Sequence, residues 1–249
     1  MRSLRGKRGG GSGGGVLNRL ERDAKRAALL ASTLFQAMRP EEVDQILKLA
    51  SERHVPRGTT IFQKGDEGSS MMAVLRGRVR VSSVSAEGRE ITLNVINPGQ
   101  IFGEIALLDG KQRSADATAT EDTLLLVVER RHFLPVLHSN DGMQLRLIAV
   151  LCERLRSTSL ALESLALFDL PARMARLLLK LGEDYGRPNE DGLRIDLKLS
   201  QRDISTIVAS SRESVNKLLR VWREDGLVDL KAGYLVLRRP NQLRLMFEQ

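Results

Sequence analysis

The strongest constraint on the fold is a series of short β-prone runs between His54 and Leu134. The runs are Thr59–Gln63, Met71–Leu75, Val79–Val84, Ile91–Ile96 and Thr123–Val128. Turn-forming residues separate them, at Gly58, Gly65-Asp66, Gly77, Glu87-Gly88 and Pro98-Gly99. About eight short strands punctuated in this way predict an antiparallel sandwich or jelly roll.

Length and hydropathy indicate a globular chain. It has 249 residues, of which 42% are hydrophobic, and a mean hydropathy of −0.20, which suits one or two domains with a sizeable core. The longest aliphatic run, Leu124–Val128, is far shorter than the roughly 20 residues of a membrane-spanning helix. The basic N-terminus has no apolar stretch of signal-peptide type. We therefore expect a cytoplasmic protein without a membrane partner.

The single cysteine, Cys152, excludes several kinds of site. One thiol cannot close an intrachain disulfide, supply a zinc site of several thiolates or hold a cysteine-ligated iron–sulfur cluster. Redox sensing through such a cluster is excluded.

The net charge of +8 is unevenly distributed. Residues 1–20 carry five basic and no acidic side chains, residues 21–167 carry 19 of each, and residues 168–249 carry 15 basic against 12 acidic. The excess in the last segment is compatible with nucleic-acid binding there.

The first residues form a glycine-rich basic tail that we expect to be disordered over 1–20, because it cannot bury enough apolar surface. Gly9–Gly14 fits a dinucleotide-binding pattern and Gly10–Gly14 a nucleophile elbow, but both lack the flanking strand and helix. A basic arm on DNA phosphates and an unused upstream start remain open alternatives.

Helical periodicity brackets the β-rich segment. It runs from Leu17 to about Ala50, with Pro40-Glu41-Glu42 as a helix start, and again from about Asp141 to Leu167. In the second helix a 3,4 repeat places seven residues on one seam: Leu145, Ile148, Cys152, Leu155, Ser159, Leu162 and Ala166. This repeat predicts a parallel coiled-coil dimer with Cys152 as a small buried hydrophobe. The alternative is a face packed on the chain's own core.

The C-terminal third predicts a helix-turn-helix. After a helix over Pro171–Leu181 and a polar loop through Arg187-Pro188-Asn189, two capping-box patterns follow ten residues apart, Ser200–Asp203 and Ser210–Glu213. Gly226 ends the second helix, and Leu227–Leu230 with Tyr234–Leu237 predicts a hairpin, the wing of a winged helix.

The second helix has two faces. Val215, Leu218, Leu219 and Trp222 form the packing face, and Arg212, Glu213, Asn216, Lys217 and Arg220 the opposite one. Arginine can bind guanine and glutamate can accept from cytosine, and Arg212 and Glu213 lie at the end that enters a major groove. The alternative is a solvated charged face.

From about residue 34 onward the sequence resembles the Crp–Fnr superfamily of bacterial transcription regulators, those built like the cyclic AMP receptor protein. The resemblance centres on Phe102–Leu108 followed by Arg113-Ser114-Ala115, which is similar to the phosphate-binding cassette of cyclic-nucleotide domains. Together with the patterns above, it implies an α+β fold: a disordered tail (1–20), a cyclic-nucleotide-binding antiparallel jelly roll with N-terminal helices (21–139), a dimerisation helix (140–167) and a winged helix-turn-helix (168–249).

The cassette resemblance implies ligand-binding roles. Glu104 would contact the ribose 2′-hydroxyl, Arg113 the cyclic phosphate, and Ser114 with nearby N–H groups the same phosphate, while Gly103 permits close backbone approach. The full set of expected ligand-binding residues is Gly103, Glu104, Ile105, Ala106, Arg113, Ser114, Ala115, Thr158 and Ser159. The alternative is a surface salt bridge between Glu104 and Arg113 in a domain that binds nothing or another effector.

Thr158 and Ser159 point to the cyclic-AMP-binding branch of the family, because they stand where the cyclic AMP receptor protein has an adenine-contacting Thr-Ser pair. The resemblance implies that Thr158 of one subunit and Ser159 of its partner bind adenine. The alternative is a polar residue that sets the coiled-coil register.

In the helix-turn-helix, the resemblance lies in Ser211–Val215 and implies a TGTGA-like half-site. The expected DNA-binding residues are Ser200, Gln201, Arg202, Ser211, Arg212, Glu213, Asn216, Lys217 and Arg220. Two departures weaken the match. Lys217 replaces an arginine and lacks its planar fork, and Ala209 stands where a glycine is common in the tight turn.

The sequence thus predicts a homodimeric, cyclic-AMP-responsive transcription regulator that binds double-stranded DNA and, by family, RNA polymerase. We expect no enzymatic activity and no cofactor apart from the allosteric ligand cyclic AMP. The alternatives are the same fold with another effector, haem or none, and a cyclic-nucleotide-binding regulatory subunit that does not bind DNA. Haem is disfavoured because His54, His132 and His138 have no ligand spacing.

Overall fold

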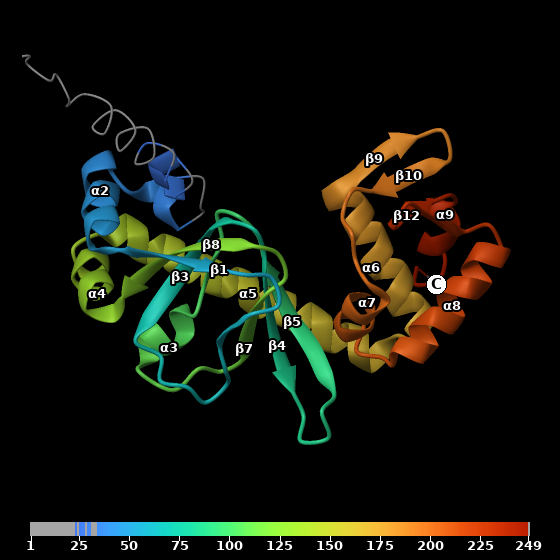
Figure 1. The fold of residues 1–249 in the computed structure, drawn as a ribbon, viewed down its shortest axis with the longest axis horizontal. Helices are drawn as coiled ribbons and strands as arrows, with labels where there is room; N and C mark the ends of the chain where they lie inside the picture. Colours follow the sequence, from blue (N-terminus) through green and yellow to red (C-terminus); the bar gives the residue numbers. More distant parts are fainter. Residues whose placement is uncertain (1–22, 24, 28, 31–33, 249) are drawn as a thin grey trace, which may run out of the picture. The chain divides into compact units, whose positions relative to one another are not determined.

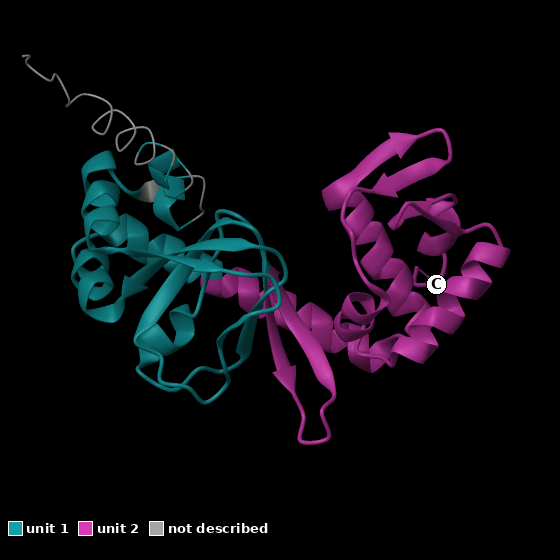
Figure 2. Ribbon diagram, viewed as in Figure 1, with its two compact units in different colours: residues 1–79, 96–150 teal, residues 80–95, 151–249 magenta. Residues whose placement is uncertain are grey.

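The computed structural model describes residues 23, 25–27, 29–30 and 34–248. The predicted tail over 1–20 and the helix onset at Leu17 lie outside these residues. The chain divides into two compact units, residues 1–79 with 96–150 and residues 80–95 with 151–249 (Figure 2). No helix among the described residues is long and apolar enough to cross a membrane.

In the first unit, residues 23, 25–27 and 29–30 are helical, and two short helical segments follow, η1 (Phe35–Ala37) and α2 (Pro40–Leu49). Helix α2 starts at Pro40, as predicted, and Glu42 accepts a hydrogen bond from the backbone N–H of Arg39 at 2.8 Å. This bond is the main reason that the pKa of Glu42 lies below its usual range. The apolar face of α2 buries Val43 and Ile46.

Antiparallel strands follow, as the β-prone runs predict (Figure 1). They are β1 (Ser51–Val55), β2 (Thr60–Phe62), β3 (Ser70–Arg76), β4 (Val79–Val84), β5 (Glu90–Ile96), β6 (Ile101–Phe102), β7 (Asp116–Ala119) and β8 (Thr123–Glu129). One sheet has the order β1-β8-β3-β6 and the other β2-β7-β4-β5. Glycines with positive φ occupy the predicted turns at Gly58, Gly65, Gly77, Gly88 and Gly99. The α+β class is confirmed.

The β-rich segment ends earlier than predicted. Arg130–His138 forms helix α4 although it contains Pro135. Phe133 and Leu137 are buried and lie one helical turn apart, and their packing outweighs the loss that a proline causes inside a helix.

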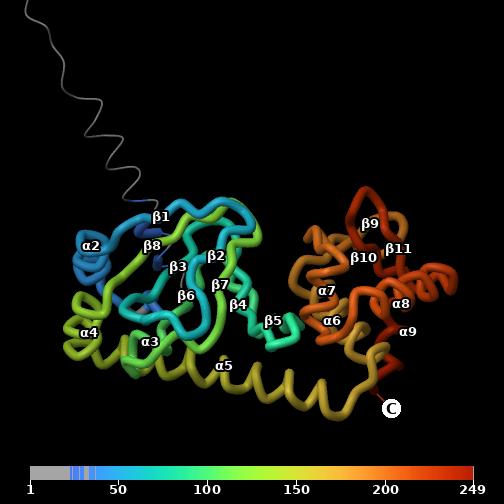
Figure 3. The backbone as a smooth tube through the Cα atoms, turned by 60° about the horizontal axis from the view of Figure 1, so that its bottom comes forward, coloured from blue at the N-terminus to red at the C-terminus, as the bar shows by residue number. Residues whose placement is uncertain are grey.

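Helix α5 covers Asp141–Leu167, as predicted, and Figure 3 shows it as one continuous helix. It buries Met143 and Leu147, which lie outside the predicted seam. The seam residues are exposed, with Leu145 and Leu155 each 68% and Leu162 67% accessible. Cys152 is exposed too, so its predicted burial depends on a second copy of the chain. The seam therefore does not pack on the chain's own core.

The second unit is built on helix α6 (Leu170–Tyr185), helix α7 (Gln201–Ile207), helix α8 (Arg212–Glu224), helix α9 (Pro240–Arg244) and a sheet in the order β11-β12-β10-β9. The predicted hairpin forms β11 (Val228–Lys231) and β12 (Tyr234–Leu237). The hydrophobic core of the second unit includes Met174, Leu178, Ile204, Val215, Trp222 and Leu237.

The polar loop predicted through Arg187-Pro188-Asn189 is wrong. These residues lie in strand β9 (Gly186–Asn189), which pairs with β10 (Gly192–Ile195). Pro188 led to the wrong prediction, because proline has no N–H to donate to a neighbouring strand. Strand β9 is, however, the edge strand of its sheet, where proline is tolerated.

Candidate functional site

The predicted ligand cassette begins where strand β6 passes into helix α3 (Glu104–Asp109) through Gly103. Gly103 has a φ of 77°, and a Cβ atom at this position would lie 2.6 Å from Nη1 of Arg113. The positive φ therefore favours glycine here, and a larger residue would also displace the guanidinium of Arg113. Glu104 and Ala106 are buried at the start of α3, whereas Ile105 is exposed.

Arg113 is held from three sides. Its Nη1 donates to the carbonyl oxygen of Gly103 at 2.7 Å, and its Nη2 donates to Oγ of Ser70 at 3.2 Å. The guanidinium carbon lies 4.3 Å from the ring centroid of Phe62. Sequence reasoning missed Ser70 and Phe62, because a lone serine or a strand phenylalanine carries no signal that it contacts a distant arginine.

The surroundings of Arg113 favour an anion. Only 5% of the residue is exposed, and burial lowers the pKa of its guanidinium, while the negative charges of Glu104 and Asp66 partly offset that shift. Within the described part of the chain, Nε of Arg113 is buried and has no hydrogen-bond partner. A buried charged donor without an acceptor is costly, so a ligand with acceptor oxygens would be favoured here.

The other two predicted cassette residues, Ser114 and Ala115, follow Arg113 directly in the sequence. Ser114 is exposed, and Ala115 is buried. The main chain at Arg113 is fixed by two bonds, from its N–H to the carbonyl of Asp66 at 2.8 Å and from the N–H of Gly65 to its carbonyl at 2.9 Å. The structure thus brings Gly103, Glu104 and Arg113 together.

Thr158 and Ser159 lie on α5 with exposed side chains. Each hydroxyl donates to the carbonyl four residues earlier, Thr158 to Arg154 at 2.9 Å and Ser159 to Leu155 at 3.0 Å. The protons are thus occupied, but the oxygen lone pairs can still accept from an amino group.

Helix α7 begins with the predicted capping box. The N–H of Asp203 donates to Oγ of Ser200 at 3.1 Å, and the N–H of Ser200 donates to the Asp203 carboxylate at 2.9 Å. Gln201 and Arg202 therefore occupy the first turn, as in the prediction.

The second predicted capping box is wrong by one residue. Helix α8 is capped by Ser211 rather than Ser210, through a bond from the N–H of Ser214 to Oγ of Ser211 at 3.1 Å. Glu213 is therefore one position too early to close a capping box. Hydrogen bonds from its own N–H and from the Ser211 hydroxyl hold the pKa of Glu213 below its usual range, so it is an acceptor at neutral pH.

The two faces of α8 separate as predicted. Val215, Leu219 and Trp222 are buried and Leu218 is partly buried, while Arg212, Glu213, Lys217 and Arg220 are exposed. Asn216 is half-buried. Ala209, in the turn before α8, has a φ of 50°, the left-handed conformation that glycine adopts more easily than alanine. Ala232 and Gly233 have φ values of 50° and 83° at the wing turn, the pattern of a two-residue hairpin loop.

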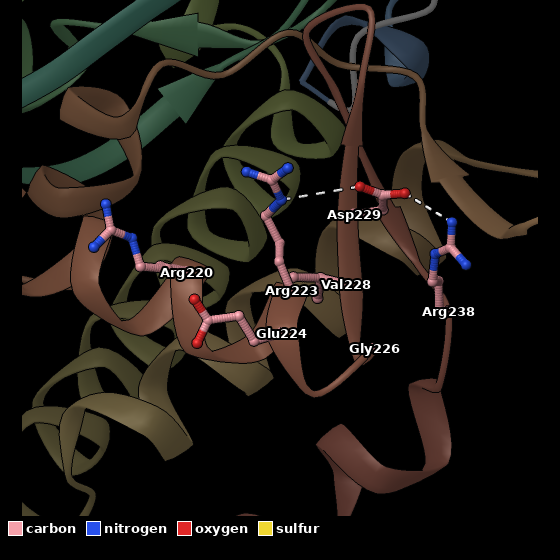
Figure 4. Close-up of a pocket in the computed structure, with 7 residues that line it drawn as sticks. All are labelled: Arg220, Arg223, Glu224, Gly226, Val228, Asp229 and Arg238. Atoms are coloured by element: carbon pink, nitrogen blue, oxygen red, sulfur yellow. Dashed lines mark hydrogen bonds and ion pairs between the residues drawn. The ribbon is translucent and has the colours of Figure 1, made fainter.

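A groove lies where the end of α8 meets the wing (Figure 4). Asp229 joins two of its arginines, because it accepts from Arg238 at 2.7 Å and faces Nε of Arg223 at 3.9 Å. The bond from Arg238 is the main reason that the pKa of Asp229 lies below its usual range. Arg220 lines the same groove from the predicted DNA-facing side of α8.

Two family models match these regions. The cyclic nucleotide-binding domain matches residues 52–140, and the Crp-like helix-turn-helix domain matches residues 172–246. The described residues contain no group of three or more His, Cys, Asp or Glu residues that could hold a metal ion.

Individual relatives agree with the two models. A cyclic AMP receptor protein from Thermus thermophilus is 35% identical over 207 residues, which cover 83% of this chain and 93% of that protein. A global nitrogen regulator from Synechocystis is 31% identical over 193 residues, covering 77% of this chain and 86% of that protein. The solved structure of a CRP-family transcriptional regulator from Thermus thermophilus has a TM-score of 0.67 at 28% identity, covering 79% of this chain and 97% of that chain.

Proposed function

Because this chain belongs to the Crp–Fnr family of DNA-binding transcription regulators, which are not enzymes, and carries a cyclic nucleotide-binding domain, we propose that it is a cyclic-AMP-responsive regulator. In this proposal it acts as a homodimer, binds a TGTGA-like inverted repeat and works with RNA polymerase. Cyclic AMP is an allosteric ligand, and no other cofactor is required.

The observation that carries the ligand proposal is the Arg113 guanidinium, buried against Gly103 and Phe62 with an Nε that has no hydrogen-bond partner among the described residues. Its positive charge suits a single phosphate anion, and a charge-assisted bond in a buried site is strong. Glu104, buried at the start of α3, is the acceptor for a ribose hydroxyl. The 35% identity to a protein named cyclic AMP receptor protein supports the choice of cyclic AMP.

The hydroxyls of Thr158 and Ser159 are the proposed adenine contacts. Their oxygens keep lone pairs that can accept from the exocyclic amino group of adenine. In guanine that position carries an acceptor oxygen, so this contact favours cyclic AMP over cyclic GMP.

The dimer proposal rests on the exposed seam of α5. Leu145, Ile148, Leu155 and Leu162 are each more than half exposed and repeat at coiled-coil spacing. A row of large exposed aliphatic residues is unfavourable in water and marks an interaction surface. A second copy of α5 in parallel would bury the row, including Cys152.

The DNA proposal assigns base reading to Arg212 and Glu213. Both are exposed in the first turn of α8, the end that enters the major groove in this class of motif. An arginine suits guanine and an ionised glutamate suits cytosine, in agreement with a TGTGA-like half-site. Lys217 is a point donor, so discrimination at the base that it faces should be weaker.

A second candidate keeps the fold and changes the effector. It is favoured by the 31% identity to a global nitrogen regulator, because that identity is close to the 35% shared with the cyclic AMP receptor protein and the two relatives are named for different regulatory roles. Calorimetric titration of the pure protein separates the two candidates. Saturable heat with one cyclic AMP per chain supports the first, and no heat with cyclic AMP contradicts it.

A further inference from the structure

The β4–β5 hairpin carries a charge cluster that reaches the first helix of the helix-turn-helix. The hairpin lies within the segment matched by the cyclic nucleotide-binding domain, yet residues 80–95 belong to the same compact unit as α7 (Figure 2). Two arginines and two carboxylates form the cluster: Arg80 and Glu90 from the hairpin, and Arg202 and Asp203 from α7.

The four side chains form a chain of ion pairs, in the order Asp203, Arg80, Glu90 and Arg202. Arg80 pairs with Glu90 at 2.9 Å across the hairpin and with Asp203 at 3.5 Å. Glu90 in turn faces Nη2 of Arg202 at 3.7 Å. The side chains of Arg80 and Glu90 are only 17% and 14% exposed, so solvent screens this part of the cluster less than it screens surface ion pairs.

A neutral contact lies beside the charges. Oγ1 of Thr92 and Oγ1 of Thr206 are 2.9 Å apart. Thr206 donates its own proton to the carbonyl of Asp203 at 2.9 Å, so Thr92 is the donor to Thr206. The hairpin is therefore attached to α7 by ion pairs at one point and by a directional hydrogen bond at another.

These contacts compete with DNA. The first helix of a helix-turn-helix crosses the phosphate backbone, and Arg202 lies in its first turn. A phosphate would need the guanidinium that Glu90 faces, and the carboxylate of Glu90 would repel the phosphate. Docking of the hairpin on α7 and docking of DNA on α7 therefore oppose each other.

We propose that the β4–β5 hairpin is an autoinhibitory clamp on α7, with Glu90 in the place of a DNA phosphate. This inference rests on the proposed function, since it describes how DNA binding is restrained. Molecules with the clamp closed bind DNA weakly, and any ligand that favours the open form tightens DNA binding by shifting the population.

A reversible crosslink tests the clamp directly. Thr92→Cys and Thr206→Cys are introduced in a Cys152→Ala background, because the hydroxyl oxygens that they replace are 2.9 Å apart. Oxidation should remove both free thiols, and the oxidised protein should still migrate as a single chain on a non-reducing gel, which shows that the disulfide lies within one chain. The oxidised protein should bind a TGTGA-type palindromic duplex at least tenfold more weakly than the reduced protein in the presence of cyclic AMP.

Charge variants give a second, milder measurement. Glu90→Gln should tighten DNA binding without cyclic AMP by at least about threefold. Glu87→Gln is the matched control, because it removes the same charge from the exposed tip of the same hairpin, where Glu87 pairs with Arg89 at 3.8 Å and hydrogen-bonds with Ser85. It should change DNA affinity by less than a factor of two at the same salt concentration.

The outcomes separate the clamp from the proposed function. Thiols that stay free under oxidising conditions contradict the docking, and an oxidised protein that binds DNA as well as the reduced one contradicts the inhibition. Equal effects of Glu90→Gln and Glu87→Gln contradict the role of Glu90. If even the reduced protein binds no duplex, with or without cyclic AMP, the proposed function fails, and the inhibitory role fails with it.

Discussion

Nη1 of Arg113 donates a 2.7 Å hydrogen bond to the carbonyl oxygen of Gly103, at the residue where β6 turns into α3. Any side chain at position 103 would meet that guanidinium, since a Cβ would lie 2.6 Å from Nη1. The turn and the buried cation thus depend on each other. This pairing orients the proposed phosphate-binding charge before any ligand arrives.

Arg113→Ala should weaken cyclic AMP binding by at least about 1.5–3 kcal/mol, the contribution of a hydrogen bond to a charged group. Isothermal titration calorimetry measures the loss. Arg131→Ala is the control, because that side chain is 74% exposed and pairs with Glu129 outside the cassette. An unchanged dissociation constant for Arg113→Ala would remove the cassette assignment.

Ser114 should leave the protein with a preference for cyclic AMP over cyclic GMP. The resemblance to the cyclic-nucleotide cassette implies that threonine after the cassette arginine accompanies cyclic GMP preference, so we expect Ser114→Thr to narrow the ratio of the cyclic GMP dissociation constant to the cyclic AMP dissociation constant. Parallel titrations of both nucleotides into both proteins measure it. Equal or tighter binding of cyclic GMP by the unmodified protein would contradict the proposed ligand.

Ala209→Gly should stabilise the helix-turn-helix. A left-handed alanine destabilises the fold by roughly 1–2 kcal/mol, and this strain is relieved by glycine. The greater backbone entropy of glycine in the unfolded chain offsets about 0.5–1 kcal/mol of that gain. The net gain in the free energy of unfolding should be about 0.5–1 kcal/mol, measured by urea denaturation. Ala161→Gly, at an exposed position inside α5, should have the opposite sign. A loss at position 209 would show that the turn is not strained.

Leu155→Glu should dissociate the proposed dimer. A buried leucine contributes about 1.5–3 kcal/mol, which a symmetric dimer would lose twice, so the dimer dissociation constant should rise at least about 100-fold. Analytical ultracentrifugation measures it. Leu160→Glu changes a leucine on α5 that is 54% exposed and lies off the seam, and it should leave the dimer intact. A monomeric unmodified protein, or equal effects of both changes, would rule out the seam.

Patterns set by local chemistry were predictable from the sequence. Alternating strands, the glycine turns, the length of α5 and the cap at Ser200 all depend on residues close together in the chain. The left-handed backbone at Ala209 was suggested by the resemblance alone, because similar helix-turn-helix motifs commonly have a glycine in this tight turn.

Features that depend on tertiary contacts were not predictable. Strand β9 contains Pro188 and forms because β10 offers a partner. Helix α4 forms around Pro135 because Phe133 and Leu137 find a core. The cap of α8 is Ser211 rather than the predicted Ser210, because either of two adjacent serines can start such a capping pattern. No sequence signal joins Arg80 to Asp203 or Arg113 to Phe62, because those pairs are created by the fold.

Arg212→Ala and Ser159→Ala should separate the two functions of the protein. Arg212→Ala should remove most sequence preference, about 1–3 kcal/mol at the base that it reads, while cyclic AMP binding stays intact. Ser159→Ala should weaken the response to cyclic AMP more than the base preference. The comparison uses specific and scrambled duplexes for DNA and calorimetry for the nucleotide. The reverse pattern would exchange the roles assigned to α5 and α8.

The account is tested most directly by fluorescence anisotropy on a TGTGA-type palindrome and on a scrambled duplex, with and without cyclic AMP. The salt concentration is held fixed, because phosphate contacts make every DNA affinity salt-dependent. Coupling between two sites is usually about 1–3 kcal/mol, so cyclic AMP should tighten binding to the palindrome by roughly 5–150-fold. If calorimetry shows that cyclic AMP binds while the affinities for both duplexes stay unchanged, ligand-gated DNA binding is wrong for this protein.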